Sequence, residues 1–342
     1  MKKIVTFGEV LLRFSKESHL RLSQGREMTA NFGGSEANAA VSLALLGNEV
    51  RYVTCLPDNA LGRACQMKLR EYGLDTRFIH WGGERIGTYY FEDAVSLRAP
   101  RMVYDRMGSA FYQLKPGMID WRQVFRGVDV FHCSGITCAV SQDAADATFE
   151  AVETADEMGL TIACDINYRK NLWNYGVRAA DVLPRLMSHS DIVFGDAGEW
   201  ELVSGLPRIP FKATSSDYPV DVEAYARMFQ QIAARFPRCQ KFILGLRHEP
   251  SANHHLLSGV LYNRSQLFRT HIYDIDPVID PMGVGDAYLA AYLHAHFNRP
   301  GNDQDCLDFA LAGSALKNSI SGDFNLSTEE EIEALMALHP SH

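Results

Sequence analysis

Apolar and polar positions follow two different patterns along the chain, and each pattern indicates one kind of element. Short apolar runs rich in β-branched residues are typical of buried strands, and longer Ala/Leu-rich stretches that end at glycine are typical of helices. The predicted strands of a main sheet are residues 4–8, 50–55, 128–133, 160–165, 191–194, 241–244, 257–262 and 267–273. The predicted helices are residues 35–46, 60–72, 143–158, 179–188, 222–234, 284–293, 306–320 and 328–338. Because strands and helices alternate, we expect an α/β fold: a doubly wound, mostly parallel sheet flanked by helices, with ligands beyond the carboxyl ends of its strands.

Two stretches depart from this alternation. Residues 11–32 are polar, with apolar side chains at irregular spacing and no strong helical pattern. Residues 86–111 contain two runs of aromatic and β-branched residues, Gly87–Glu92 and Arg101–Arg106, that favour strands. We expect the two stretches to form a small sheet inserted in a single domain that spans residues 1–342. The alternative is that both stretches are surface loops.

Composition and charge exclude several classes of protein. The chain has 342 residues, 46% hydrophobic and 22% charged, which is typical of a globular protein, and its formal charge of −9 argues against nucleic-acid binding. Among the seven cysteines, Cys133 and Cys138 are five residues apart and form no C-x-x-C pair, which argues against a structural zinc. The first apolar run is too short for a signal peptide, and no window reaches the roughly 18 apolar residues of a membrane span. We therefore predict a cytoplasmic protein with no nucleic-acid or membrane partner.

The stretch with the clearest chemistry is Gly283-Val284-Gly285-Asp286, which lies between a predicted strand and a predicted helix. A helix start presents unpaired N–H groups and the positive end of the helix dipole, and glycines let a phosphate approach those groups. Asp286 then lies in the first turn, where a carboxylate can take a proton from an attacking hydroxyl. The combination indicates phosphoryl transfer, with the N–H groups of residues 283–285 as an anion hole. The alternative is a glycine-rich loop in which Asp286 only caps the helix.

A second glycine motif, Gly33-Gly34 followed by Asn38, gives the chain a family resemblance when it is taken with the first. The two motifs in this order, with a lid insertion between strand and helix, resemble those of ribokinase-like (PfkB-type) sugar kinases over nearly the whole chain. The resemblance implies a ribokinase-like fold, with the small sheet as a lid over the sugar. It implies ATP as phosphoryl donor, Mg²⁺ held by ATP and water rather than directly by the protein, and contacts from Gly34 and Asn38 to sugar hydroxyls. We expect position 34 to be glycine because a side chain there would occupy the space of the sugar.

Three further stretches, 104–110, 165–173 and 315–325, resemble 2-keto-3-deoxygluconate kinases within that family. A sugar acid needs cations, and arginine binds a carboxylate with two parallel hydrogen bonds. Arg106 and Arg169 are the arginines expected to bind the acid, with Tyr90 and Tyr104 packing and hydrogen-bonding over the sugar. Alternatives are a surface ion pair for Arg169 and simple lid packing for Tyr104. The predicted activity is phosphorylation of the primary hydroxyl of 2-keto-3-deoxygluconate to its 6-phosphate, with Asp286 as the general base.

The chain departs from the family pattern in three places. The family's Asp-Thr before the second glycine motif is Asp280-Pro281 here, which removes a hydroxyl. The family's N-x-x-E, which organises Mg²⁺ through water, has Asp196 in place of its Asn, with Glu199 retained, so these two residues are expected near the nucleotide and its metal. At the nucleotide turn, Arg247 either faces the phosphates or is a solvated loop residue. Asn318 is a further nucleotide-binding candidate that rests on the resemblance.

Three other functions compete with this reading. A neutral-sugar kinase of the fructokinase or ribokinase type would not need Arg106 and Arg169. A sugar-acid sensor without catalysis would fit the altered positions 196 and 281. A dinucleotide-dependent oxidoreductase would need a G-x-G-x-x-G turn after the first strand, where Gly8 is the single glycine. The small lid sheet has too little core of its own, so we also predict a homodimer formed through the lids.

Overall fold

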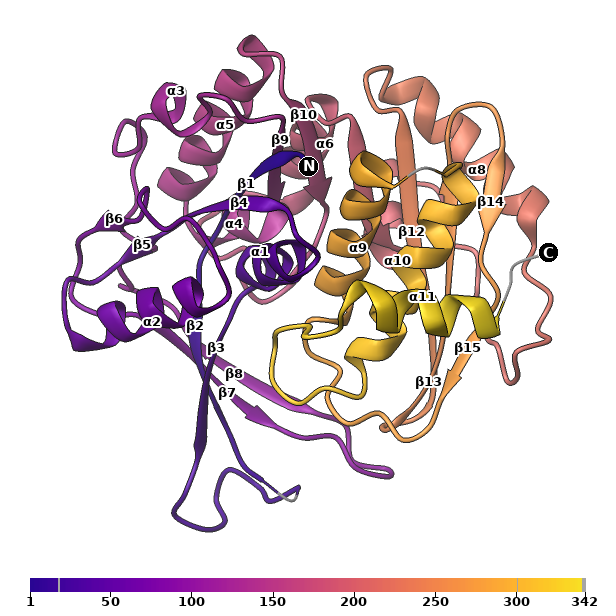
Figure 1. Cartoon of the computed structure of the whole chain (residues 1–342), viewed down its shortest axis with the longest axis horizontal. Helices are drawn as coiled ribbons and strands as arrows, with labels where there is room; N and C mark the ends of the chain where they lie inside the picture. Colours follow the sequence, from indigo (N-terminus) through magenta and orange to yellow (C-terminus); the bar gives the residue numbers. More distant parts are fainter. Residues whose placement is uncertain (18, 300, 340–342) are drawn as a thin grey trace.

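The protein is described by a computed structural model that covers residues 1–17, 19–299 and 301–339. A nine-stranded sheet forms its centre, with the order β14-β13-β12-β11-β10-β9-β1-β4 and with β15 paired to β13 (Figure 1). The strands are β1 (Lys3–Phe7), β4 (Glu49–Val53), β9 (Val130–Ser134), β10 (Thr161–Asp165), β11 (Ile192–Asp196), β12 (Lys241–Ser251), β13 (His254–Tyr262), β14 (Leu267–Arg269) and β15 (Tyr273–Ile275). Pairing is parallel from β4 through β12 and antiparallel beyond it. The predicted mostly parallel sheet is therefore confirmed.

Helices cover both faces of this sheet, as expected for a doubly wound fold. One apolar cluster joins one face to α1 (Ser35–Leu45), α2 (Ala60–Glu71), α9 (Val284–Asn298), α10 (Asp303–Lys317) and α11 (Glu329–Leu338). Two further clusters join the other face to α3 (Trp121–Val124), α4 (Gly135–Val140), α5 (Gln142–Glu157), α6 (Ala179–Ser188), α7 (Ala197–Ser204) and α8 (Val222–Arg235). None of the helices in the described part of the chain is long and apolar enough to cross a membrane.

A separate four-stranded sheet forms the lid, with the order β3-β2-β7-β8. Its strands are β2 (Leu11–Ser15), β3 (Thr29–Gly33), β7 (Gly87–Glu92) and β8 (Arg101–Asp105). They project away from the central sheet in Figure 1. A two-stranded pair, β5 (Cys55–Leu56) and β6 (His80–Trp81), lies beside α2. The two stretches that break the strand–helix alternation therefore form a sheet rather than surface loops.

Several predicted boundaries were wrong, each for a local reason. Strand β12 continues to Ser251 instead of ending at residue 244, because it pairs with β13 in a long hairpin. The predicted strand 267–273 is two short strands, β14 and β15, which pair with different parts of β13. Helix α7 is not apparent from apolar periodicity because it spans only eight residues.

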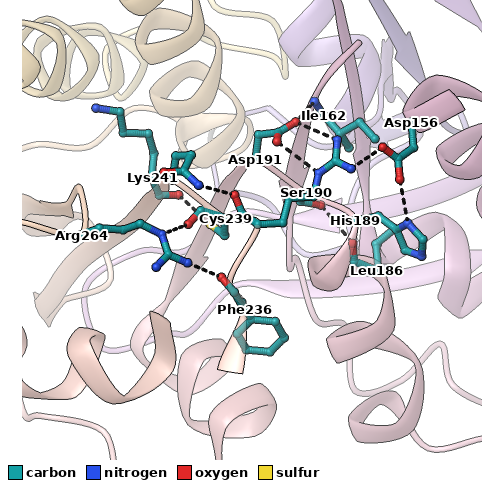
Figure 2. Close-up of polar contacts among 12 residues, drawn as sticks. Asp156, Ile162, Leu186, His189, Ser190, Asp191, Phe236, Cys239, Lys241 and Arg264 are labelled. Atoms are coloured by element: carbon teal, nitrogen blue, oxygen red, sulfur yellow. Dashed lines mark hydrogen bonds and ion pairs between the residues drawn. The ribbon is translucent and has the colours of Figure 1, made fainter. Parts of the chain in front are cut away.

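The amino ends of the central strands are fastened by polar contacts, part of which Figure 2 shows. Asp191, just before β11, accepts a hydrogen bond from the Ile162 backbone N–H of β10 at 2.8 Å. Arg238, just before β12, donates to Asp191 at 3.1 Å and pairs with Asp156 near the end of α5. The loops at this edge are therefore tied together, and the opposite, carboxyl edge carries the open cleft.

Candidate active site

A cleft of 1110 Å³ lies between the carboxyl ends of β10 to β12, the lid and the start of α9. Asp165 ends β10 and Asp196 ends β11, and both line it, as the fold class predicts for a doubly wound sheet. The lid reaches across the cleft, because the Ala252 backbone N–H of the β12–β13 turn donates to the Ser96 carbonyl of the β7–β8 loop at 3.2 Å. The cleft is therefore bounded by both sheets.

The predicted anion hole is the first turn of α9. Gly283 is the N-cap and has φ of 78°, a left-handed conformation that favours glycine, and a Cβ there would overlap the Asp323 carbonyl oxygen. A Cβ on Gly285 would meet nothing within 4 Å, so this glycine leaves space open at the cleft. The first N–H groups of a helix have no acceptor within the helix. Gly283, Val284 and Gly285 therefore form a turn that can accept an anionic group from the cleft.

Asp286 lies in this first turn and is held by side chains from the other glycine motif. Ser35 donates to its Oδ1 at 2.6 Å, and Asn38 Nδ2 donates to its Oδ2 at 2.7 Å. Asn167, with φ of 40°, donates in turn to the Ser35 hydroxyl at 2.8 Å. Burial raises the pKa of the Asp286 carboxyl, while the bonds from Ser35 and Asn38 oppose this rise. A carboxylate fixed in this way has the position and the basicity that a general base needs.

Gly34 and Asn38 make contacts within the protein that the sequence analysis does not predict. A Cβ on Gly34 would overlap the backbone carbonyl of Glu9, so packing, rather than the space of a sugar, requires glycine there. Asn38 Oδ1 accepts from the Gly34 N–H at 3.1 Å, while its Nδ2 holds Asp286. Both ends of this amide are thus engaged inside the protein, and Asn38 orients the Asp286 carboxylate. A contact of Gly34 or Asn38 with sugar hydroxyls remains a prediction.

The two predicted arginines have different surroundings. Arg169 is exposed and lines the cleft, and within the described chain no carboxylate oxygen lies within 4.0 Å of its guanidinium. Arg106 is 8% exposed, and its Nε donates to Glu9 Oε2 at 2.6 Å. Glu9 is buried as well and also accepts from Ser109. Arg169 therefore faces the cleft without an ion-pair partner among the described residues, although its charge limits the rise in pKa that burial causes in the Asp165, Glu199 and Asp286 carboxyls. Arg106 already has a buried carboxylate partner.

The two predicted tyrosines lie on opposite faces of the lid. Tyr104 lines the cleft and packs with Leu11, Tyr89 and Phe91. Tyr90 is the neighbour of Tyr89 in β7, so its ring points to the other face, where it stacks on Phe14 at 5.5 Å. The structure thus contradicts the packing of Tyr90 over the cleft, and Tyr89, which pairs with Tyr104 across β7 and β8, takes that face.

Three of the four predicted nucleotide-binding residues line the cleft, and the fourth does not. Asp196 and Glu199 line the cleft and form the capping box of α7, with reciprocal backbone bonds of 2.8 Å. Arg247 also lines the cleft, on β12 rather than on a loop, and pairs with Glu249 at 3.1 Å. Asn318 does not line it: the residue is fully buried, and its backbone carbonyl accepts from the N–H groups of residues 279 and 280. Asn318 therefore lies outside the cleft and holds backbone N–H groups, whereas the prediction has it contact the nucleotide.

Carboxyl groups gather in the cleft at the ends of β10 and β11. Burial, with Asp196 close by, raises the pKa of Glu199 to about 7, and burial together with Glu199 and Asp286 raises the pKa of Asp165 well above its usual value. Among the described residues, no three His, Cys, Asp or Glu side chains are grouped so as to hold a metal themselves. Carboxylates with raised pKa values fit a cation that arrives with a ligand, because its charge would relieve their repulsion.

Sequence reasoning missed Ser35, Asn167 and Tyr89. Ser35 directly follows the Gly33-Gly34 pair, and a hydroxyl at that position is a signal for a hydrogen-bond partner of Asp286. Tyr89 could have been found from strand alternation, because it lies opposite Tyr104. Asn167 lies in the 165–173 stretch that carries the resemblance, but its left-handed backbone was not visible in the sequence.

Comparison with known proteins gives the family. The chain matches the description "pfkB family carbohydrate kinase" over residues 1–328. It is 28% identical over 335 residues to the 2-dehydro-3-deoxygalactonokinase of Haloferax volcanii, covering 98% of this chain and 96% of that protein. The crystal structure of 2-dehydro-3-deoxygluconokinase from Thermotoga maritima matches with a TM-score of 0.90 at 33% identity, over 98% of this chain and 100% of that one. A putative ribokinase II from E. coli shares the fold, with a TM-score of 0.79 at 20% identity over 98% and 100% of the two chains. The chain has the ribokinase-like fold and belongs to the PfkB family of carbohydrate kinases.

Proposed function

We propose that the protein transfers the γ-phosphoryl group of ATP to the primary hydroxyl of 2-keto-3-deoxygluconate (2-dehydro-3-deoxygluconate), giving the 6-phosphate and ADP. The observation that carries the proposal is that one cleft holds both Asp286, at a glycine-capped helix start, and Arg169, a cation with no ion-pair partner in the described structure. The first group suits phosphoryl transfer, and the second suits a substrate with a carboxylate. The names of the relatives support the same substrate class.

The chemistry follows from the positions of these groups. Asp286 accepts the proton of the 6-hydroxyl as the hydroxyl oxygen forms its bond to the γ-phosphorus. The bond between that phosphorus and the β–γ bridging oxygen breaks, and ADP leaves with the electron pair. The N–H groups of Gly283, Val284 and Gly285 stabilise the charge on the transferred group. Ser35 and Asn38 hold the Asp286 carboxylate in place throughout, because each bonds one of its oxygens.

Asp196 and Glu199 are the residues expected near the metal that accompanies ATP. Asp196 and Glu199 would lie beside Mg²⁺ and contact it through water, and Mg²⁺ when bound neutralises charge on the phosphates. The sugar would lie between Arg169 and the lid, where the ring of Tyr104 faces the cleft. Arg169 would bind the carboxylate of the substrate and so set which end of the sugar faces Asp286.

A coupled assay of ADP release tests the proposal. Substrates are 2-keto-3-deoxygluconate, its galactonate epimer, gluconate, fructose and ribose, each with ATP and Mg²⁺. We expect kcat/KM for one of the two keto-deoxy acids to exceed that for every neutral sugar. Turnover that favours fructose or ribose would assign the protein to the neutral-sugar kinases, and binding of the acids without ADP release would identify a sensor.

A further inference from the structure

Lys317, the last residue of α10, is fully buried, which is rare for a lysine. Its ammonium donates to two backbone carbonyl oxygens, that of Ile320 at 2.8 Å and that of Asp280 at 3.4 Å. Asp280 lies three residues before Gly283, the N-cap of α9. The ammonium is therefore a buried cation on carbonyl oxygens, directly beneath the segment that leads into the anion hole.

The same face of α10 holds this segment at two more points. Ser314 Oγ donates to the Val284 carbonyl at 3.0 Å, in the first turn of α9. The Asn318 carbonyl accepts from the N–H groups of Ile279 and Asp280, at 2.8 and 3.3 Å. Residues three and four apart lie on one side of a helix, so a single face of α10 fixes both the approach to the anion hole and its first turn.

A second buried cation, Arg13 of lid strand β2, completes the arrangement. Arg13 lies between the carboxylates of Asp280 at 2.9 Å and Asp323 at 3.0 Å, and its side chain is 3% exposed. Tyr89, also from the lid, donates to Asp323. The Asp280 carboxylate accepts from the N–H groups of Met282 and Gly322, each at 3.0 Å. Two cations and two carboxylates thus neutralise one another around the segment 280–283.

These charges keep the ammonium charged despite its burial. Burial is the main cause that lowers the pKa of Lys317, to about 8, and the charge of Arg13 also lowers it. The carboxylates of Asp280, Asp323 and Asp286 raise this pKa and so limit the fall. At neutral pH the side chain therefore remains mostly protonated. Replacing it by an apolar residue would leave the carbonyls of Asp280 and Ile320 without a donor, which costs more than the bonds themselves contribute.

We propose that Lys317 is the resident cation of this kinase: a positioning residue whose ammonium holds the anion hole in its phosphate-binding shape. Carbonyl oxygens are also the ligands that K⁺ takes in proteins, so a tethered ammonium can do the work of a bound monovalent cation. It follows that turnover does not depend on added monovalent cations. The inference rests on the proposed function, because it assigns the turn at 283–285 to a phosphoryl group.

The first test uses the unaltered protein and its best substrate from the ADP-release panel. Turnover is measured in tetramethylammonium buffer and then with K⁺, Na⁺ or NH₄⁺ added at equal ionic strength. We expect kcat to change by less than about twofold, because the cation position is already filled. A rise of about tenfold or more with K⁺ would overturn the proposal, because the carbonyl site would then need an external ion.

The second test removes the ammonium. In Lys317→Met we expect kcat to fall by about ten- to a hundredfold with KM for the sugar little changed, since the residues that line the cleft remain. Added NH₄⁺ or K⁺ should restore part of the loss by entering the vacated position. Lys241→Met is the matched control, because Lys241 pairs with Asp303 at 2.5 Å and neither residue lines the cleft. That variant should keep its kcat and show no response to cations.

A readout that does not need activity separates this inference from the proposed function. The melting temperature of Lys317→Met should rise with K⁺ or NH₄⁺ more than that of the unaltered protein or of Lys241→Met. Wild-type kcat in Lys317→Met, or a loss that neither ion relieves in turnover or melting, would refute the role of Lys317. Absence of sugar-dependent ADP release by the unaltered protein would instead refute the proposed function, while the melting comparison would still test the cation position.

Discussion

Arg169 and Arg106 were predicted to share one role, and their surroundings lead to opposite expectations for their removal. Arg169→Ala removes a guanidinium that faces the cleft and has no carboxylate partner in the described structure. Arg106→Ala instead leaves the buried Glu9 carboxylate with Ser109 as its remaining donor. The first change should affect a substrate that carries a carboxylate, and the second should affect folding.

The magnitudes follow from those contacts. A hydrogen bond to a charged group contributes about 1.5–3 kcal/mol, so Arg169→Ala should lower kcat/KM for the sugar acid by roughly ten- to a hundredfold or somewhat more. Arg169→Lys should recover part of this, because an ammonium keeps the charge but not the planar pair of donors. Removing one partner of a buried ion pair costs about 3–5 kcal/mol, so Arg106→Ala should lower the free energy of unfolding by about that amount.

The deciding assay compares two substrates. One is 2-keto-3-deoxygluconate, and the other is the 3-deoxyketose with a hydroxymethyl group in place of the carboxylate. The unaltered protein should use the neutral analogue poorly, and Arg169→Ala should make it little worse. If Arg169→Ala lowers kcat/KM for both substrates by the same factor, the arginine serves the phosphoryl group or the fold, and the reasoning from its cleft-facing guanidinium fails. Urea unfolding of both variants provides the stability comparison.

Three further predictions concern the base, a buried carboxyl and the lid. Asp286→Asn should lower kcat by roughly two to four powers of ten with sugar binding largely kept, measured by single turnover and calorimetry, and near-normal turnover would reject the general base. Burial raises the pKa of Glu36 to about 7 from 4.5, so the folded state retains a proton that the unfolded chain releases, and stability falls as pH rises between those values. The free energy of unfolding of Glu36→Gln, relative to that of the unaltered protein, should therefore rise by up to about 3 kcal/mol from pH 4.5 to pH 8 in urea unfolding. An equal difference at both pH values would contradict the raised pKa of Glu36. The outer lid face carries the stacked rings of Phe14 and Tyr90 beside Val103, which is 45% exposed, so light scattering should give a dimer that Val103→Glu weakens, and a single-chain mass for the unaltered protein would exclude it.

The parts of the fold that could be predicted from sequence are those with strong local signals. Gly34 and Gly47 mark the two ends of α1, and Gly283 marks the start of α9, so the position of Asp286 in the first turn of α9 follows from the sequence. The hairpin of β12 was missed because its second half is polar and contains Pro250, while its stability comes from pairing with β13. Strand order and pairing are properties of the whole chain, and local pattern does not determine them.

The site was predictable where a residue type alone implies its chemistry, and less so where partners decide it. Nothing in the sequence distinguishes the role of Arg106 from that of Arg169. The partner that neutralises Arg106 is Glu9, which lies 97 residues away along the chain. Sequence alone does not say which face of β7 points to the cleft, so it does not distinguish Tyr89 from Tyr90. The spacing of Asp196 and Glu199 fits the family's metal motif, and it is also the spacing of a helix capping box, which the structure shows.

The most direct test of the central claim is identification of the product. The protein is incubated with ATP, Mg²⁺ and 2-keto-3-deoxygluconate, and the mixture is followed by phosphorus and carbon NMR. We predict one ADP for each phosphate monoester formed, with the ester on the primary 6-hydroxyl, and almost none of either with Asp286→Asn. An acyl phosphate on the substrate carboxylate, an ester at another hydroxyl, or ADP formed without a sugar phosphate would contradict the assignment of Arg169 to the acid and of Asp286 to the hydroxyl.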